Sequence, residues 1–90
     1  MARMIMGTEL VKTIHVKYYA GLREQRGLNQ ETLTTNAKTA AQLYDELQKR
    51  HGFKLSTKFL KVAVNDEYRD WQIALKNGDT IVFIPPVAGG

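Results

Sequence analysis

The sequence of 90 residues contains no cysteine. Without a thiol the chain has no disulfide bond, no thiolate metal site and no cysteine nucleophile, which is compatible with a reducing compartment. Long hydrophobic runs are also missing, since the longest fall far short of the ~20 apolar residues that a membrane span needs. The N-terminal stretch lacks the apolar segment of a signal peptide. We therefore expect a cytoplasmic protein that does not bind membranes.

Motifs of the common enzyme classes are missing as well. The sequence has no glycine-rich phosphate loop, no nucleophile elbow and no zinc-spaced histidines, because His15 and His51 fall on different predicted elements. We expect structural or surface roles for both histidines, and no metal site. The single tryptophan, Trp71, leaves two roles open, contact with a partner and a place at the edge of the core.

The charge is mildly basic, with 13 Lys and Arg against 9 Asp and Glu. Part of it forms a local run that also contains Phe53 and Phe59. The cations of this run are Lys49, Arg50, Lys54, Lys58 and Lys61. Basic residues with interleaved aromatics are typical of nucleic-acid platforms. We interpret the phenylalanines as core residues and the cations as solvated surface or a source of anion attraction, so no nucleic-acid partner is expected.

The rest of the composition is ordinary for one globular domain, with 43% hydrophobic and 24% charged residues. Residues 12–19 alternate apolar and polar side chains, and this period of two predicts a first, half-buried strand. Residues 20–29 predict a short helical or irregular turn. The threonine-rich residues 30–36 predict a weaker second strand that forms a hairpin with the first and lies at a sheet edge.

The clearest predicted element is a helix over residues 40–51. Thr39 and Gln42 form the pattern of a capping box, and Gly52 stands where a left-handed residue ends a helix. The apolar residues of the helix recur at i, i+3, i+4 and i+7, which predicts one buried stripe. These residues are Ala40, Leu43, Tyr44 and Leu47. One amphipathic helix among strands must cover one face of a sheet.

Three further segments complete the predicted sheet. Residues 59–65 ("FLKVAVN") predict a strand, the residues around Tyr68 a short strand or irregular excursion, and residues 80–84 a last strand after a tight turn. We therefore predict an α+β fold, a mixed sheet of four to five strands wrapped round one main helix. The helix makes a crossover possible that places the last strand beside the first and parallel to it.

One helix leaves the second face of this sheet without a predicted cover. Successive side chains of a strand point to opposite faces, so one apolar set of the last strand leaves the core whichever register is right. The outward candidates are Tyr19, Tyr68, Val82 and Ile84. We predict that they form a partner-binding patch; the alternative is a buried central strand that is merely apolar on both faces.

The last six residues, "PPVAGG", are predicted to form an extended tail at 85–90, after a domain at 12–84 and a flexible lead-in at 1–11. The two prolines end the last strand and direct the tail away from the fold, and six residues reach at most about 20 Å. Gly89 and Gly90 have no Cβ, so a narrow tunnel in another protein admits them. A nucleophile attacks the Gly90 carbonyl only after a nucleotide has activated the carboxylate. A frayed terminus is the alternative.

Three motifs of the sequence, taken together, match the pattern of a known protein family. They are "YYAGLRE" at residues 18–24, "VAVNDEY" at residues 62–68 and "GDTIVFIPPVAGG" at residues 78–90. With them the chain resembles the β-grasp, ubiquitin-like sulfur carriers of the MoaD/ThiS type, over about residues 13–90. It is most similar to the MoaD-type small subunits of molybdopterin synthase, because the thiazole-forming carriers usually lack the paired prolines.

The resemblance implies a β-grasp fold and a mechanism with no cofactor bound to the chain. A ubiquitin-activating-type adenylating enzyme, similar to MoeB, would consume ATP to adenylate Gly90, and a sulfur donor would convert it to a thiocarboxylate. The tail would then enter the large subunit of molybdopterin synthase and give its sulfur to a pyranopterin precursor. Most catalytic side chains would belong to that large subunit, with which the chain would form a hetero-oligomer.

The resemblance assigns the reactive end to Gly89 and Gly90, and apolar partner contacts to Tyr19, Tyr68 and Ile84. The open face and the tail add further partner-binding candidates. These are Val82, Pro85, Pro86, Val87 and Ala88. The sequence departs from the family in having tyrosine at positions 18 and 19, where the family often has phenylalanine, and in its extra N-terminal residues, so the details of the contacts differ.

Two other uses of the same terminus stay open. A ubiquitin-like protein modifier would share the adenylation and would join Gly90 to target lysines through isopeptide bonds. A sulfur carrier for another pathway, such as thiamine synthesis or tRNA thiolation, would differ only in the acceptor of the sulfur. A plain interaction module would not use its carboxylate at all.

Overall fold

Eight elements make up the part of the chain that the structure describes, residues 11–85 of the computed structural model. Residues 1–10 and 86–90 lie outside the described residues, and with them most of the predicted lead-in and tail. In chain order the elements are β1 (Lys12–Tyr18), α2 (Ala20–Arg26), β2 (Gln30–Thr35), α3 (Ala40–His51), the 3₁₀ turn η1 (Thr57–Phe59), β3 (Lys61–Val64), β4 (Glu67–Arg69) and β5 (Thr80–Ile84).

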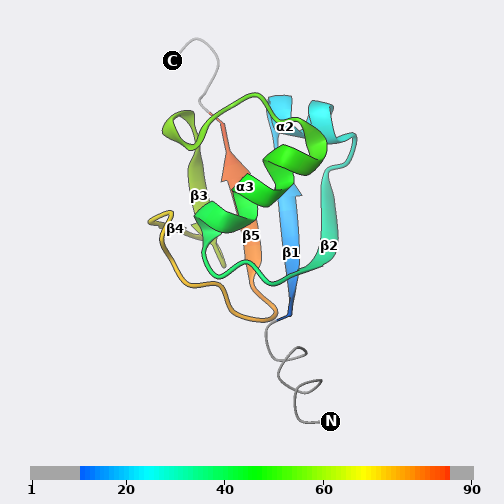
Figure 1. The fold of residues 1–90 in the computed structure, drawn as a ribbon. Helices are drawn as coiled ribbons and strands as arrows, with labels where there is room; N and C mark the ends of the chain where they lie inside the picture. Colours follow the sequence, from blue (N-terminus) through cyan, green and yellow to red (C-terminus); the bar gives the residue numbers. More distant parts are fainter. Residues whose placement is uncertain (1–10, 86–90) are drawn as a thin grey trace.

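The five strands form one mixed sheet in the order β2-β1-β5-β3-β4. β5 is parallel to β1 and antiparallel to β3, while β2 and β4 pair antiparallel with β1 and β3 at the two edges. α3 runs across one face of this sheet (Figure 1). The structure therefore has the predicted arrangement, with the second strand at an edge and the last strand beside the first.

The strand β1 owes its place in the sheet to the alternation of its side chains. Ile14, Val16 and Tyr18 are buried in the core, whereas His15 and Lys17 point to the other face and are partly exposed. β2 is polar and threonine-rich, and half of its side chains are exposed. This composition suits an edge strand, whose outer side has no neighbour.

The predicted caps of α3 are present, with one change of partner. The Thr39 hydroxyl oxygen accepts a hydrogen bond from the Gln42 backbone N–H at 3.2 Å. The Gln42 side-chain oxygen accepts from the backbone N–H of Lys38 at 2.8 Å, one residue before the position that a capping box uses. Gly52 ends the helix in the left-handed region, at φ +71°, and its N–H donates to the Gln48 carbonyl.

The helix α2 is a full two-turn element where the sequence predicted a helical or irregular turn. It buries one side chain, Leu22, in the core. Gly27 ends it at φ +81°, and the Gly27 N–H donates to the Arg23 carbonyl at 2.8 Å. This short helix joins β1 to β2 and lies at one end of these two strands (Figure 1).

Aromatic rings join α3 to the sheet. The ring of Tyr44 on α3 meets that of Phe83 on β5 edge to face, with the centroids 5.1 Å apart. Trp71 stacks on the same Phe83 ring at a centroid distance of 5.9 Å and an interplanar angle of 10°. Trp71 is partly buried and packs against the core. Of the two roles left open for it by the sequence, the structure shows the core edge.

The prediction that both phenylalanines of the basic run lie in the core is right for one and wrong for the other. Phe53 is buried, and its ring lies 5.7 Å from that of Tyr18 and 5.9 Å from that of Tyr44. Phe59 is 60% exposed. Phe59 is the last residue of the 3₁₀ turn η1, and the next residue, Leu60, is extended and buried. Phe59 therefore faces away from the core.

Leu47 is fully buried in the stripe that α3 packs on the sheet. Replacing Leu47 by alanine leaves a cavity, and we expect a loss of about 2–5 kcal/mol in the free energy of unfolding. Urea unfolding followed by circular dichroism measures the change. The matched control is Lys49→Ala on the exposed side of the same helix, which we expect to change stability by less than about 0.5 kcal/mol. Equal effects of the two variants would contradict the packing described.

Candidate functional site

The face of the sheet opposite α3 presents a row of side chains from four strands. Val82 on β5 pairs with Lys17 on β1 and with Ala63 on β3. Ala63 in turn pairs with Tyr68 on β4. Paired residues share a face of the sheet, so these four side chains lie in one line across it. Tyr68 and Val82, two of the predicted patch residues, therefore belong to the same surface.

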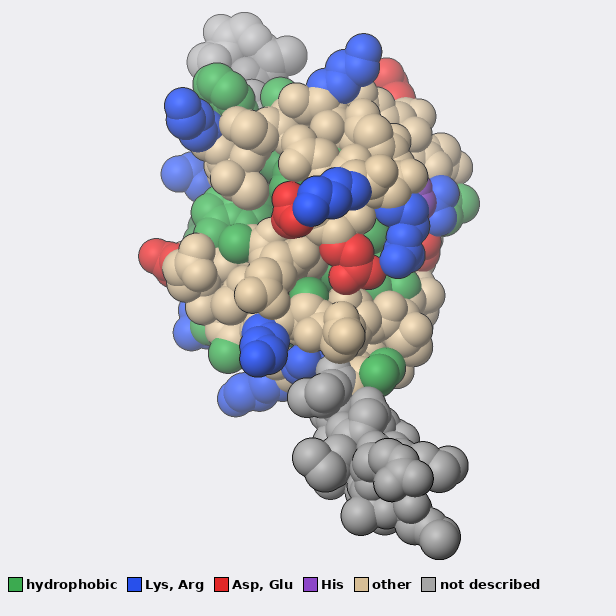
Figure 2. All heavy atoms as spheres, viewed as in Figure 1, with side chains coloured by type: hydrophobic (Ala, Val, Ile, Leu, Met, Phe, Trp, Pro, Cys, Tyr) green, Lys and Arg blue, Asp and Glu red, His purple; other side chains and the backbone are tan. Residues whose placement is uncertain are grey.

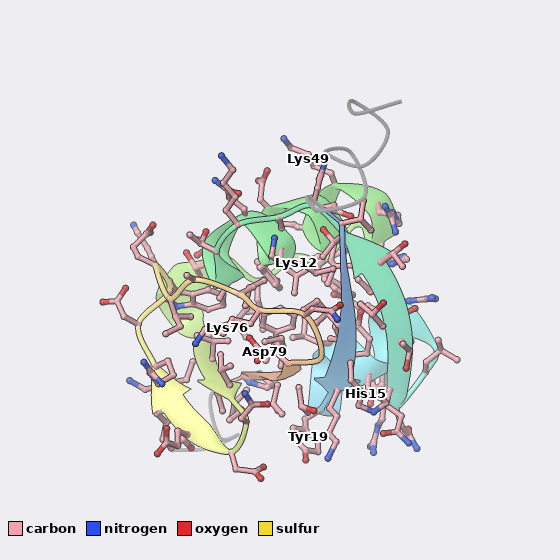
Figure 3. The ribbon with its side chains drawn as sticks, turned by 90° about the horizontal axis from the view of Figure 1, so that it is seen from below. Lys12, His15, Tyr19, Lys49, Lys76 and Asp79 are labelled. Carbon is pink, nitrogen blue, oxygen red and sulfur yellow. The ribbon has the colours of Figure 1, made fainter. Side chains whose placement is uncertain are left out.

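A second row lies where β1 and β5 end. Ile84 pairs with Lys61 on β3. Tyr18 on β1 pairs with Phe83 on β5. The residues that follow these two in the sequence, Tyr19 and Ile84, therefore lie beside each other at this end of the sheet. Figure 3 shows Tyr19 on the side of the sheet away from α3.

The predicted patch residues differ in how much of them reaches solvent. Tyr19 is 49% and Tyr68 70% exposed, and Ile84 and Pro85 are half-buried. Val82 faces the same side, but its neighbours in the row leave it only 8% exposed. On this surface the apolar side chain of Val82 is nearly covered, and the side chains of Tyr19 and Tyr68 are exposed. Exposed aromatic rings of this kind are favoured at protein–protein interfaces.

The tail begins at this surface. Pro85 follows the last residue of β5 and is the only tail residue among those that the structure describes. The other predicted tail residues, Pro86, Val87, Ala88, Gly89 and Gly90, lie outside the described residues. The structure therefore fixes where the tail starts, next to Ile84.

One exposed side chain near the tail was missed by the sequence reasoning. Phe59 lines a shallow hollow together with Ile84 and Pro85. Two lysines, Lys58 and Lys61, stand at the rim of the same hollow. The sequence contains two consecutive apolar residues before β3, Phe59 and Leu60, and of these two Leu60 is the one that is buried.

A charged network holds the end of β1 that leads to Tyr19. The Tyr18 hydroxyl donates a hydrogen bond of 2.6 Å to Glu31 on β2. Arg26 on α2 grips the same carboxylate with two hydrogen bonds, from Nε to Oε2 at 2.9 Å and from Nη2 to Oε1 at 2.8 Å. The hydrogen bonds from Arg26 lower the pKa of Glu31, with Tyr18 adding to the effect, and burial raises the pKa of Tyr18. Three elements are thereby tied together at the base of Tyr19.

A second polar cluster fixes the other end of β5. Asp79 is buried, and its carboxylate accepts hydrogen bonds from the Asn65 side chain at 3.0 Å and the Lys76 backbone N–H at 2.8 Å. The Asn65 side-chain oxygen accepts from the backbone N–H of Thr80 at 2.9 Å. Asn65 sits at φ +52°, in the left-handed turn between β3 and β4. The cluster sets the register of β3 against β5, and so decides which residues of β5 face outward.

Within the described range 11–85, no group of three or more His, Cys, Asp or Glu side chains is placed to hold a metal ion. His15 hydrogen-bonds through its two ring nitrogens to Thr32 and Gln30 on the neighbouring edge strand. Of the helices in this range, none has the length and apolar content to cross a membrane.

Comparison with known proteins identifies the family. A family model described as the ThiS family matches residues 16–90, which is most of the chain. The chain belongs to the ThiS family. The chain is 32% identical over 80 residues to the molybdopterin synthase sulfur carrier subunit of Haemophilus influenzae, covering 86% of this chain and 99% of that protein. The sulfur carrier subunit of Drosophila melanogaster is also 32% identical, over 84 residues, with 89% and 93% covered.

Solved structures of similar fold include a Pyrococcus furiosus protein described as subunit 1 of molybdopterin converting factor. Its TM-score is 0.69 at 28% identity, with 84% of this ThiS-family chain and 99% of that chain covered. A complex of subunits 1 and 2 of the same factor from Helicobacter pylori gives a TM-score of 0.60 at 29% identity, with 87% and 99% covered. Small archaeal modifier protein 1 of Haloferax volcanii shares the fold, with a TM-score of 0.70 at 22% identity and 84% and 99% covered.

These findings confirm the predicted MoaD/ThiS type and the β-grasp fold of the ThiS-family chain. The contact roles of Tyr19, Tyr68, Val82 and Ile84 stay predictions, as do those of the tail residues. The structure brings these four residues onto one face of the sheet. It adds Phe59 at the margin of that face, beside the start of the tail.

The network at the end of β1 predicts how the stability of this ThiS-family domain depends on pH. A carboxyl group with a pKa lowered by folding stabilises the domain above its ordinary pKa, and this stabilisation is lost as the pH falls through the folded pKa. We expect Glu31→Gln to reduce stability at neutral pH and to flatten the decrease in unfolding free energy below about pH 5. Urea unfolding at neutral and acidic pH measures both effects.

The control for this prediction is Glu24→Gln on α2, where the side chain is exposed. We expect it to leave the pH dependence of stability as it is in the unaltered protein. If Glu31→Gln and Glu24→Gln gave the same pH profile, the Glu31 network would have no role in holding the end of β1.

Proposed function

We propose that this chain is the sulfur-carrier subunit of a molybdopterin synthase. The observation that carries the proposal is the 32% identity to a protein of that name over 99% of that protein's length. The match covers 99% of that protein, and the family model reaches residue 90 of this chain, so the similarity supports the complete role rather than the fold alone. The diglycine at Gly89 and Gly90 supplies the group on which the chemistry would take place.

The first step of the proposed cycle activates the C-terminal carboxylate of Gly90. A carboxylate is a poor electrophile because its oxygen is a poor leaving group. A MoeB-like adenylating enzyme would therefore let a Gly90 oxygen attack the α-phosphorus of ATP, with pyrophosphate leaving and an acyl adenylate forming. Sulfur at the oxidation level of sulfide, brought by a sulfur donor, would then attack the carbonyl and displace AMP. The product is a thiocarboxylate on Gly90.

The second step passes the sulfur to a pyranopterin precursor in the large subunit. The thiocarboxylate sulfur is a much better nucleophile than a carboxylate oxygen, so it would form a carbon–sulfur bond to the precursor while the oxygen substituent on that carbon leaves with its bonding electron pair. Water then cleaves the bond between the Gly90 carbonyl and the sulfur, which leaves the sulfur on the product and restores the carboxylate. No side chain of this chain takes part in these bonds, so most catalytic side chains would belong to the large subunit.

The described domain serves this cycle by holding and aiming the tail. β5 is paired on both sides and fixed at its start by the Asp79 cluster, so the direction in which the chain leaves at Pro85 is set by the sheet. The surface around Tyr19, Tyr68 and Ile84 gives a partner an apolar face to bind. Two partners follow from the proposed steps. The large subunit would form a hetero-oligomer with this chain, and the adenylating enzyme would form a transient complex with it. Both would act in the cytoplasm, where ATP is supplied.

The alternatives differ in the acceptor. A protein modifier would transfer Gly90 itself to a lysine, and the modifier protein reported above resembles this chain in fold alone, at 22% identity. A carrier for thiamine synthesis or tRNA thiolation would use the same thiocarboxylate with another partner. The curated relatives favour the molybdopterin branch over both.

Sulfur loading tests the proposal directly. We expect the purified protein, incubated with an adenylating enzyme, ATP and a sulfur donor, to gain the mass of one oxygen-to-sulfur exchange, located on Gly90 by fragmentation. Deletion of Gly90 should abolish the exchange, because the tail then ends short of the activating site. Gly21→Ala is the control, since a methyl group at Gly21 meets no atom within 4 Å. It should load like the unaltered protein.

Two results would count against the proposal. Lysine conjugates with a Gly-Gly remnant, in place of a thiocarboxylate, would point to the modifier. Undiminished molybdopterin synthesis by the Gly90 deletion in a reconstituted system would show that the terminal carboxylate is not used.

A further inference from the structure

An open hollow lies beside the start of the tail. Its volume is about 270 Å³. Pockets for small-molecule ligands run from about 300 to 1,000 Å³ and enclose most of their ligand. The residues that line the hollow are Lys58, Phe59, Leu60, Lys61, Ile84 and Pro85. An open, shallow hollow of this volume suits one apolar side chain that projects from another protein.

Phe59 is displayed at this hollow by the local fold. The turn η1 begins after Ser56, whose hydroxyl accepts a hydrogen bond from the Lys58 backbone N–H at 3.3 Å, and it ends where Leu60 enters the core. With Leu60 buried, Phe59 is directed outward and is 60% exposed. Its side chain lines the hollow.

The position of the hollow points to its occupant. Ile84 and Pro85 are at once two of its lining residues and the last two described residues before the rest of the tail. Any protein that takes up the tail must therefore pass over or beside the hollow. Figure 2 shows hydrophobic atoms next to Lys or Arg atoms over η1, at the upper left, near the end of β5.

The charge around the hollow indicates the chemistry of that occupant. Lys58 and Lys61 are exposed and form no ion pair with another residue of the range 11–85. The basic residues of α3 differ, because Lys49 pairs with Asp45 at 3.1 Å and Arg50 pairs with Glu46 at 3.1 Å. Two lysines beside an apolar hollow complement carboxylates beside an apolar side chain.

A nucleic acid fits these observations less well than a protein. Stacking platforms for single strands offer several aromatic faces in a basic groove. Of the two phenylalanines in the basic run, Phe53 is buried and only Phe59 is exposed. The cations of α3 lie on the opposite side of the sheet from Tyr19, as the labelled Lys49 shows (Figure 3).

We propose that the hollow at Phe59 receives an apolar side chain of the large subunit that takes up the tail, with carboxylates of that subunit facing Lys58 and Lys61. The proposal rests on the proposed function for the identity of the partner. It extends the predicted patch of Tyr19, Tyr68 and Ile84 across the end of β5 to η1. The hollow then contributes to the choice of partner, because it matches shape and charge close to the reactive tail.

The test measures the Kd of the full-length protein for the molybdopterin synthase large subunit of the same organism. We expect Phe59→Ser to weaken binding by about tenfold or more, as the loss of an aromatic anchor does at protein interfaces. We expect Phe59→Leu to retain most of the affinity, since it keeps an apolar wall. The matched control is Val11→Ser, because Val11 is 49% exposed at the opposite end of β1.

A second pair of variants tests the charge. We expect Lys58→Glu with Lys61→Glu to slow association with the large subunit and to reverse its dependence on salt concentration, because salt then screens a repulsion between carboxylates instead of an attraction. Lys49→Glu on α3 is the control and should leave association unchanged. Unfolding curves show whether each variant is folded, and the exposure of all these side chains predicts that it is.

The outcomes separate this inference from the proposed function. If the unaltered protein binds the large subunit and Phe59→Ser binds equally well, the hollow is not part of the interface, while the sulfur-carrier role stands. If the unaltered protein carries sulfur on Gly90 but does not bind the large subunit, the carrier belongs to another pathway. The partner named for the hollow is then wrong.

Discussion

The pairing of β5 between β1 and β3 is the constraint on which the rest of the structure depends. A strand with neighbours on both sides cannot shift its register without moving every side chain to the other face. On one face Ile81 and Phe83 are fully buried under α3, and on the other Val82 and Ile84 form the floor of the open surface. One five-residue strand thus anchors the core, supplies part of the predicted partner surface and leads into the tail.

Polar groups at the two ends of the sheet protect this arrangement. At one end the Asp79 cluster ties β5 to the turn after β3, and at the other the Glu31 network ties β1 to α2 and β2. Both networks lie at strand ends, where the backbone hydrogen bonds between strands stop and no longer hold the strands in place. The Glu31 network ties β1 to α2 and β2 at the end of the sheet where the tail begins, which suits the proposed use of Gly90 in a partner's active site.

Much of this could be predicted from the sequence, because the local rules agree with the fold. The alternation of 12–19 and the capping pattern around α3 predicted strand and helix, and both were confirmed. The prediction that was wrong concerned two adjacent apolar residues, Phe59 and Leu60, and which of them enters the core. Phe59 was assigned to the core and is exposed, since Leu60 takes the buried position.

The open face shows a second limit of sequence reasoning. Facing outward follows from the period of a strand, but exposure also depends on the neighbours across the sheet. Val82 was predicted to lie outward and does, yet it lies between Lys17 on β1 and Ala63 on β3 and is only 8% exposed. The network of Tyr18, Arg26 and Glu31 joins three elements, so no pattern within one segment of the sequence predicts it.

The central claim is that Gly90 of this chain carries the sulfur that enters molybdopterin. The most direct measurement loads the protein with a heavy sulfur isotope on Gly90, mixes it with the large subunit and the pyranopterin precursor, and follows the isotope by mass spectrometry. The account predicts that the isotope appears in the dithiolene product and that Gly90 returns to a carboxylate. Product formed without the isotope, or label that stays on the protein in the presence of both reactants, would contradict it.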